Sequence, residues 1–175
     1  SKRIGDPIPR ERWLAARQLR TRRAAAVDPL LRGLDRNDDP VLSDLSHDSL
    51  TSLRADGRPA VRPLLSRLTA KRRESCGKYA GALYELPHDS SDIPEFLRAV
   101  RECDSTARRM LLNMLAAMRG RADPALPALE ELALHFEKKG DAPTATEIRD
   151  TAAQIRKRVI MGEKQEQYVK DGIVR

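Results

Sequence analysis

Apolar residues recur along the chain in short stripes with a common spacing. Residues 26–34 and 60–68 lie 34 positions apart and are identical at six of nine positions, including a proline followed by two leucines. Related stretches begin at Ile93 and Leu126, each about 32 residues after the one before. Apolar side chains at i, i+1 and i+4 line one face of an α-helix, and a proline in the first turn costs no hydrogen bond. The pattern predicts four amphipathic helices, one at the start of each repeat.

A second amphipathic segment follows each of these helices. Residues 41–53 form that segment in the first repeat, where serine and aspartate interrupt its apolar face. Clusters of Gly, Pro, Asp and Ser at 56–59, 87–91 and 120–124 separate the repeats and predict turns. The apolar side chains of the other three second helices are Tyr79, Leu83 and Leu86, then Leu111, Leu115 and Met118, then Ile148, Ala152 and Ile155. The predicted helical hairpins cover residues 24–57, 58–90, 91–123 and 124–160.

These repeats predict an all-α fold, an α-solenoid of about four helix-hairpin units. No unit can bury its apolar stripe alone, so consecutive units are expected to stack and cover one another. Aromatic residues make up only 3% of the chain and period-two alternation is absent, which argues against a β-sheet. An irregular helical bundle is the competing interpretation. Around the repeat domain (24–160), we expect a basic N-terminal arm with an extra helix (1–23) and a loose polar tail (161–175).

The proline-led hairpins of residues 24–160 resemble the HEAT-like family of α-solenoid repeats, with units shorter than most in that family. The last hairpin also resembles a tetratricopeptide repeat. Both resemblances imply the same architecture, in which stacked helix pairs cover one another. The residues at the packing positions of the tetratricopeptide family are Leu132, Ala133, Phe136, Gly140, Ala145 and Ala152.

Histidine and cysteine are too scattered along the chain to predict a metal site. Zinc needs about four convergent nitrogen or sulfur ligands, and His47, His88 and His135 lie far apart. Cys76 and Cys103 are expected to be buried thiols rather than nucleophiles. The sequence contains neither a glycine-rich phosphate loop nor a serine nucleophile motif. We therefore expect no metal, no cofactor and no catalytic residue, and a protein that is not an enzyme.

One acidic stretch resembles the start of a calcium-binding EF-hand loop. Asp35, Asn37 and Asp39 occupy the first three ligand positions of such a loop. Pro40 stands at the sixth position, which needs glycine, and Ser46 at the twelfth, which should supply a bidentate glutamate. The prediction is therefore an acidic turn between two helices, in which Asp39 caps the second helix.

Positive charge is the strongest remaining signal in the sequence. The formal net charge is +7 and the pI about 9.8, which favours acidic partners such as nucleic acid, anionic membrane or acidic protein. The excess lies in residues 1–34 and 58–90, while residues 35–57 between them are acidic. A solvated surface that only keeps the protein soluble is the competing interpretation. The candidate partner- or phosphate-binding residues are Arg17, Arg20, Arg22, Arg23, Lys71, Arg72 and Arg73.

Stacked repeats place their inter-helix turns side by side along one edge. That edge changes sign, from acidic at residues 37–39 to basic at residues 71–73 and mixed thereafter. Nucleic-acid grooves prefer an unbroken positive stripe with stacking aromatics. We therefore expect a non-enzymatic scaffold or adaptor that binds a protein partner through its charged edge and a concave face lined by the second helices. The alternative is a nucleic-acid-binding module whose arginines contact phosphates.

The remaining expectations concern the compartment and other ligands. The chain has no run of 18 apolar residues, so no membrane-spanning helix is predicted. Two isolated cysteines and the lack of a secretory leader indicate a reducing, cytoplasmic compartment. No small-molecule substrate site is evident.

Overall fold

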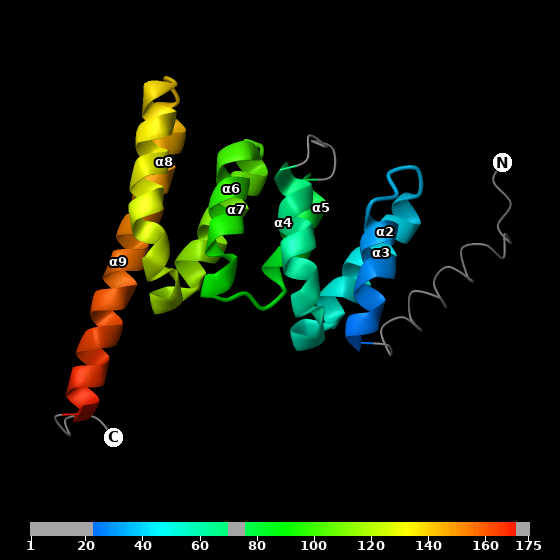
Figure 1. Cartoon of the computed structure of the whole chain (residues 1–175), viewed down its shortest axis with the longest axis horizontal. Helices are drawn as coiled ribbons and strands as arrows, with labels where there is room; N and C mark the ends of the chain where they lie inside the picture. The colour runs from blue at the N-terminus through cyan, green and yellow to red at the C-terminus, as the bar shows by residue number, and fades with distance from the viewer. Residues whose placement is uncertain (1–22, 70–75, 171–175) are drawn as a thin grey trace, which may run out of the picture. The chain divides into compact units, whose positions relative to one another are not determined.

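Helices and the short turns between them make up the described part of the chain, residues 23–69 and 76–170 of a computed structural model (Figure 1). No β-strand occurs in these two ranges, which confirms the predicted all-α class. The extra basic helix expected near the N-terminus lies almost entirely outside them. The α-helices are α2 (Val27–Leu34), α3 (Pro40–Ser52), α4 (Val61–Thr69), α5 (Cys76–Tyr84), α6 (Ile93–Glu102), α7 (Ser105–Ala117), α8 (Leu126–Lys138) and α9 (Ala142–Lys170).

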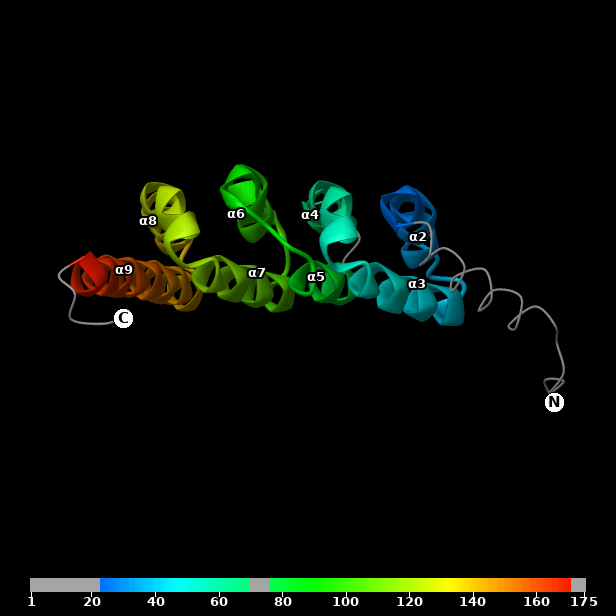
Figure 2. The same cartoon turned by 90° about the horizontal axis from the view of Figure 1, so that it is seen from below.

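The chain divides into two compact units, an N-terminal unit (Ser1–His88) and a C-terminal unit (Asp89–Arg175). The division falls inside the turn at residues 87–91, between the predicted second and third repeats. The N-terminal unit contains the helix pairs α2–α3 and α4–α5, and the C-terminal unit contains α6–α7 and α8–α9. Within each unit, the first helices of the two pairs form one layer and the second helices form the other (Figure 2).

The predicted apolar stripes of α2 and α4 lie in the core of the N-terminal unit. Burial of an aliphatic side chain contributes about 1.5–3 kcal/mol, so each stripe is a substantial source of stability. Because the two stripes occupy matching positions, the sequence repeat corresponds to a repeat in packing. The buried residues are Val27, Leu30, Leu31 and Leu34 in α2, and Val61, Leu64, Leu65 and Leu68 in α4.

The serines of α3, which interrupt its apolar face in the sequence, pack closely against α2. Ser43, Ser46 and Ser49 are all buried. Helix α2 can approach them because Gly33 has no side chain, and a Cβ there would lie only 2.1 Å from Ser46 Oγ. The Ser43 hydroxyl donates a hydrogen bond to the Leu34 carbonyl at 3.2 Å, so this buried polar group is satisfied. Small residues here allow a close helix–helix contact.

Aliphatic and aromatic side chains from all four helices form the core of the C-terminal unit. Phe96 of α6 is fully buried, and Phe136 of α8 is 6% exposed. The stripes predicted for the two second helices are confirmed, because every residue assigned to them is buried. These residues are Leu111, Leu115 and Met118 in or directly after α7, and Ile148, Ala152 and Ile155 in α9.

A 3-10 helix precedes each first helix and contains, or lies beside, the glycine- and proline-rich turns predicted between the repeats. Asp89 and Asp92 form a reciprocal capping box ahead of α6. At the acidic turn before α3, the Leu42 N–H donates to Asp39 Oδ1 at 3.1 Å, which confirms Asp39 as the predicted cap. The 3-10 helices are η1 (Arg23–Ala26), η2 (Arg54–Ala60), η4 (Ser90–Asp92) and η5 (Arg119–Ala125).

Helix α9 is longer than the sequence analysis predicted. It continues to Lys170, so the expectation of a loose tail was wrong for residues 161–170. This stretch consists mostly of Glu, Gln, Lys and Met, whose long unbranched side chains lose little freedom in a helix. The single glycine in it, Gly162, is not enough to end the helix.

Candidate functional site

The structure does not describe the side chains of the basic residues predicted to bind a partner or phosphate. Of Arg23 only the backbone is described, as the first residue of η1. The proposed roles of these residues therefore stay predictions. The residues that lie wholly outside the described ranges are Arg17, Arg20, Arg22, Lys71, Arg72 and Arg73.

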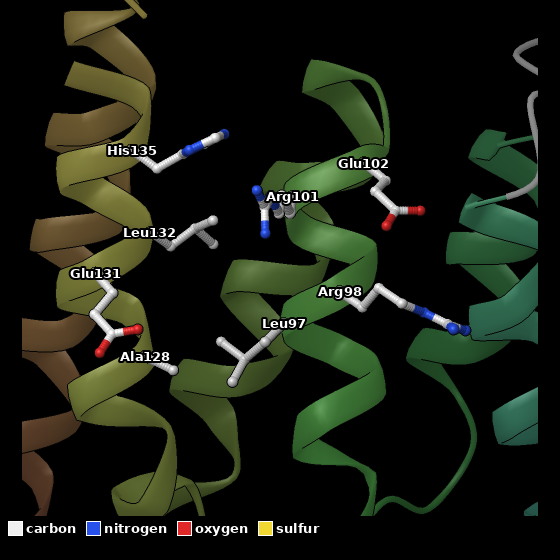
Figure 3. Close-up of a pocket in the computed structure, with 8 residues that line it drawn as sticks. All are labelled: Leu97, Arg98, Arg101, Glu102, Ala128, Glu131, Leu132 and His135. Atoms are coloured by element: carbon white, nitrogen blue, oxygen red, sulfur yellow. The ribbon is translucent and has the colours of Figure 1, made fainter. Parts of the chain in front are cut away.

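A groove of about 570 Å³ lies between α6 and α8, the two first helices of the C-terminal unit (Figure 3). The second helices α7 and α9 pack extensively against each other, whereas α6 and α8 contact each other at few positions. Space therefore remains between the first helices. Each helix supplies four lining residues, Leu97, Arg98, Arg101 and Glu102 from α6 and Ala128, Glu131, Leu132 and His135 from α8.

The floor of the groove is apolar. Leu97 of α6 points toward α8, and Ala128 and Leu132 of α8 point toward α6 (Figure 3). Ala128 and Leu132 are four residues apart and so lie on one face of their helix. Leu97 and Ala128 are half-buried, and Leu132 is 8% exposed. This floor offers a contact surface for an apolar group of a ligand.

Two polar side chains extend across the groove beside this floor. Arg101 projects from α6 toward α8, and His135 projects from α8 toward α6 (Figure 3). Arg98 and Glu102, by contrast, point away from α8. The inward-facing charge contributed by α6 is therefore the Arg101 guanidinium.

Cations gather at the end of the groove near the C-termini of both helices. Lys138 is the last residue of α8 and Lys139 follows it, and both lie close enough to His135 for their charges to act on it, as the charge of Arg101 does. Arg101, Lys138 and Lys139 are exposed. Within the described ranges none of these three cations forms an ion pair.

The glutamates on the opposite side of α8 are engaged within the unit. Glu137 forms an ion pair with Arg149 of α9, in which Oε2 lies 2.5 Å from Nη2. Glu130 forms an ion pair with Arg156 of the same helix. These pairs join α8 to α9 and engage both glutamates within the unit. Exposed pairs of this kind contribute only about 0–1 kcal/mol each to stability.

His135 sits half-buried at the cationic end of the groove. Its partial burial lowers its pKa from 6.5, and the charges of Lys139, Arg101 and Lys138 lower the pKa further. The imidazole is therefore neutral at pH 7. Its ring packs edge-on against Phe136, with the ring centroids 5.7 Å apart and an interplanar angle of 84°. A neutral imidazole offers one hydrogen-bond donor and one acceptor to a ligand.

Arg108 of α7 fixes the helices that form the groove. Its Nε donates to the Val100 carbonyl at 2.8 Å and its Nη2 to the Cys103 carbonyl at 2.9 Å, so it satisfies the C-terminal end of α6. Nη1 donates to Thr144 Oγ1 of α9 at 3.3 Å, and the guanidinium carbon lies 4.5 Å from the ring centroid of Phe136 in α8. This side chain is only 9% exposed and joins all four helices of the unit.

A different arginine joins the first helices of the N-terminal unit. Arg67, near the end of α4, donates from Nε and Nη2 to the carboxylate of Asp35, directly after α2, at 2.9–3.2 Å. The Tyr79 hydroxyl of α5 donates to the same carboxylate at 2.8 Å. The Arg67 and Asp35 side chains are 28% and 25% exposed. The charges of Arg67 and Asp35, which link the first helices α2 and α4, are therefore paired within the unit.

The acidic turn with EF-hand resemblance has structural roles. Asp35 accepts from Arg67 and Tyr79, and Asp39 caps α3. Among the described residues, no group of three or more His, Cys, Asp or Glu side chains could hold a metal ion. Cys76 and Cys103 are both buried, as predicted.

The sequence analysis missed the groove because it followed the buried stripes and assigned binding to the second helices. The groove is lined by the first helices. A signal was present, since Leu97 and Arg101, and Ala128 and Leu132, recur at helical spacing beside the buried stripe. The separation of α6 and α8, which turns these faces into a groove, cannot be obtained from spacing within one helix.

Comparisons of the chain with protein-family models, with curated proteins and with solved structures find no match. In the part of the chain that the structure describes, no helix combines the length and apolar composition that a membrane crossing requires. The groove and its charges are therefore the basis for a functional proposal.

Proposed function

We propose that this protein is a non-enzymatic helical-repeat module that binds a protein partner, and that the groove between α6 and α8 receives a segment of that partner. The observation that carries the proposal is the apolar floor of Leu97, Ala128 and Leu132 with charged side chains beside it. Protein-binding surfaces combine an apolar centre with a polar rim that sets orientation. The groove has both components.

The proposal includes the architecture. Both units contain two helix pairs whose apolar residues occupy corresponding positions, and this supports stacking of the four pairs as one α-solenoid similar to HEAT repeats. In such an array a surface between neighbouring first helices recurs from one repeat to the next. We propose that the partner binds along this recurring surface.

Nucleic-acid binding is the alternative, favoured by the net charge of +7. At the groove itself, Glu102 and Glu131 lie among the lining residues, and carboxylates repel a phosphate backbone. The groove therefore fits a peptide better than a nucleic-acid strand, whereas the basic N-terminal segment could serve either partner.

The proposal is tested by affinity capture from a nuclease-treated lysate of the cells that produce this protein. Ala128→Trp fills the floor of the groove, and Ala153→Trp adds the same side chain at an exposed position of α9 as a matched control. We expect the wild type and the control to retain one protein that Ala128→Trp loses. A partner captured from an untreated lysate but not from the nuclease-treated one would favour nucleic acid, and capture that is unchanged in Ala128→Trp would exclude the groove.

A further inference from the structure

The charges along the groove are unevenly distributed. Arg101 projects into the space between the helices, and Lys138 and Lys139 lie beyond it at the end of α8. Glu131 lies one helical turn before His135, toward the other end of the groove. The groove thus has a cationic end with three exposed positive charges, and Glu102, which lines the groove at the same end, points away from α8.

The cations at this end lack the internal partners that similar residues have elsewhere in the unit. Arg109, on α7, pairs with Glu147 of α9 at 2.9 Å, and Arg149 pairs with Glu137. Within the described ranges Arg101 has no such pair. An anionic group placed beside Arg101 would gain a charge-assisted hydrogen bond without displacing an existing one.

The apolar floor limits which anion can use this site. Leu97, Ala128 and Leu132 offer contacts to a hydrocarbon side chain next to the cationic end. Inorganic phosphate or a nucleic-acid backbone would leave this floor uncovered. A peptide that carries an apolar side chain next to carboxylates would cover the floor and neutralise the cations together.

We propose that the groove between α6 and α8 selects an acidic segment of a partner protein, with one apolar side chain on the floor and its carboxylates beside Arg101, Lys138 and Lys139. This inference rests on the proposed function and specifies the chemistry of the partner. His135 lines the same groove, and its neutral imidazole offers one N–H donor to such a carboxylate.

The test uses fluorescence anisotropy with two short labelled peptides, one in which a central leucine is flanked by glutamates and one in which it is flanked by glutamines. At low salt we expect the full-length protein to bind the glutamate peptide at least about ten-fold more tightly, and the difference to shrink as salt rises. Equal affinity for the two peptides would overturn the inference.

Matched charge reversals in the C-terminal unit locate the effect. Arg101→Glu and Lys157→Glu change the net charge equally, but Arg101 points toward α8 whereas Lys157 lies on α9 and does not line the groove. Both residues are exposed, so the variants should keep the circular dichroism spectrum and melting temperature of the wild type. We expect Arg101→Glu to abolish the preference for glutamate and Lys157→Glu to keep it within about two-fold. Equal losses would show that only net charge matters and would overturn the inference.

Two further outcomes separate this inference from its alternatives. Tighter binding of duplex DNA than of the glutamate peptide, with the same dependence on Arg101, would assign the groove to nucleic acid and overturn the inference. Loss of lysate capture in Ala128→Trp without any preference for the glutamate peptide would overturn acidic selection while the proposed function stands. A glutamate preference that depends on Arg101, without a groove-dependent lysate partner, would support acidic selection and contradict the proposed function.

Discussion

The two units join their helix pairs through arginines placed in different layers. In the N-terminal unit, Arg67 of α4 reaches Asp35 at the end of α2, so an ion pair directly links one first helix to the other. In the C-terminal unit, Arg108 lies on the second helix α7 and contacts the other three helices from there. Among the described residues, no ion pair involving Arg101 of α6 or Glu131 of α8 links these two first helices.

This difference shows that charges on corresponding surfaces of the two units can be used within the fold in one unit and left exposed in the other. A charge that is hydrogen-bonded within the protein contributes to stability and is less available to a ligand. An exposed charge without such a partner contributes little to stability but favours association with an oppositely charged ligand. The surface between α6 and α8 belongs to the second class.

The largest expected effect is that of removing Arg108. Arg108→Met keeps an aliphatic chain of similar length but leaves the Val100 and Cys103 carbonyls without their donors and removes the cation from Phe136. We expect the free energy of unfolding of the C-terminal unit to fall by about 3 kcal/mol. Hydrogen exchange measured during urea denaturation resolves the two units. A decrease in the free energy of unfolding of less than about 1 kcal/mol would contradict the proposed role of Arg108.

Removing Arg67 should cost less, because its partner is partly solvated. Arg67→Met leaves Asp35 with the Tyr79 hydrogen bond and access to water, so we expect a loss of about 1–2 kcal/mol in the N-terminal unit. The control is Arg36→Met, which breaks an exposed pair with Asp38 and should leave the free energy of unfolding almost unchanged. If Arg67→Met is as costly as Arg108→Met in the same denaturation experiment, the proposed contrast between the units fails.

Glycine substitutions sharpen the comparison further, because α2 and α3 pack closely only through small residues. Gly33→Ala places a Cβ against Ser46, so we expect a loss of about 1 kcal/mol despite the better helix propensity of alanine. Gly77→Ala, in α5, meets no atom within 4 Å and should be neutral or stabilising by up to about 1 kcal/mol. Thermal unfolding of both variants checks the sign, and a stabilising Gly33→Ala would show that α2 and α3 can separate.

The smallest expected effect is the pH dependence contributed by His135 in the C-terminal unit. The pKa of His135 in the folded protein lies below its ordinary value of 6.5, so the unfolded chain binds a proton first as the pH falls. The contribution of His135 to stability is complete above pH 6.5 and is lost as the pH falls through the folded pKa. We expect His135→Gln to lose less stability than the wild type between pH 7 and about pH 5 in urea titrations. Parallel pH curves for the two proteins would contradict a lowered pKa.

Much of the secondary structure could be predicted from the sequence, because the signals are local. The proline-led stripes around Leu30 and Leu64 identify the first helices, since they depend only on helical spacing and on the free N–H groups of the first turn. The cap formed by Asp39 follows in the same way from its position before Pro40. Interactions within one helix or turn are therefore visible in the chain itself.

The candidate site could not be predicted, because its features depend on distances between helices. Arg108 and Arg109 are neighbours in sequence, yet one is buried against three other helices and the other is exposed in a pair with Glu147. Helical phase places Arg108 on the same face as Leu111 and Leu115, but does not reveal the carbonyls that accept its hydrogen bonds. Likewise, the helical spacing of the groove residues is visible in the sequence, but the space between α6 and α8 is visible only in the structure.

The most direct test of the central claim is a map of backbone amide shifts by nuclear magnetic resonance, recorded while the glutamate-flanked leucine peptide is added to the full-length protein. We predict that the shifts concentrate in residues 97–102 and 128–135, and that Arg101→Glu removes them while Lys157→Glu does not. Shifts concentrated in α2 and α4 of the N-terminal unit, or none in α6 and α8, would contradict the assignment of the groove as the binding site.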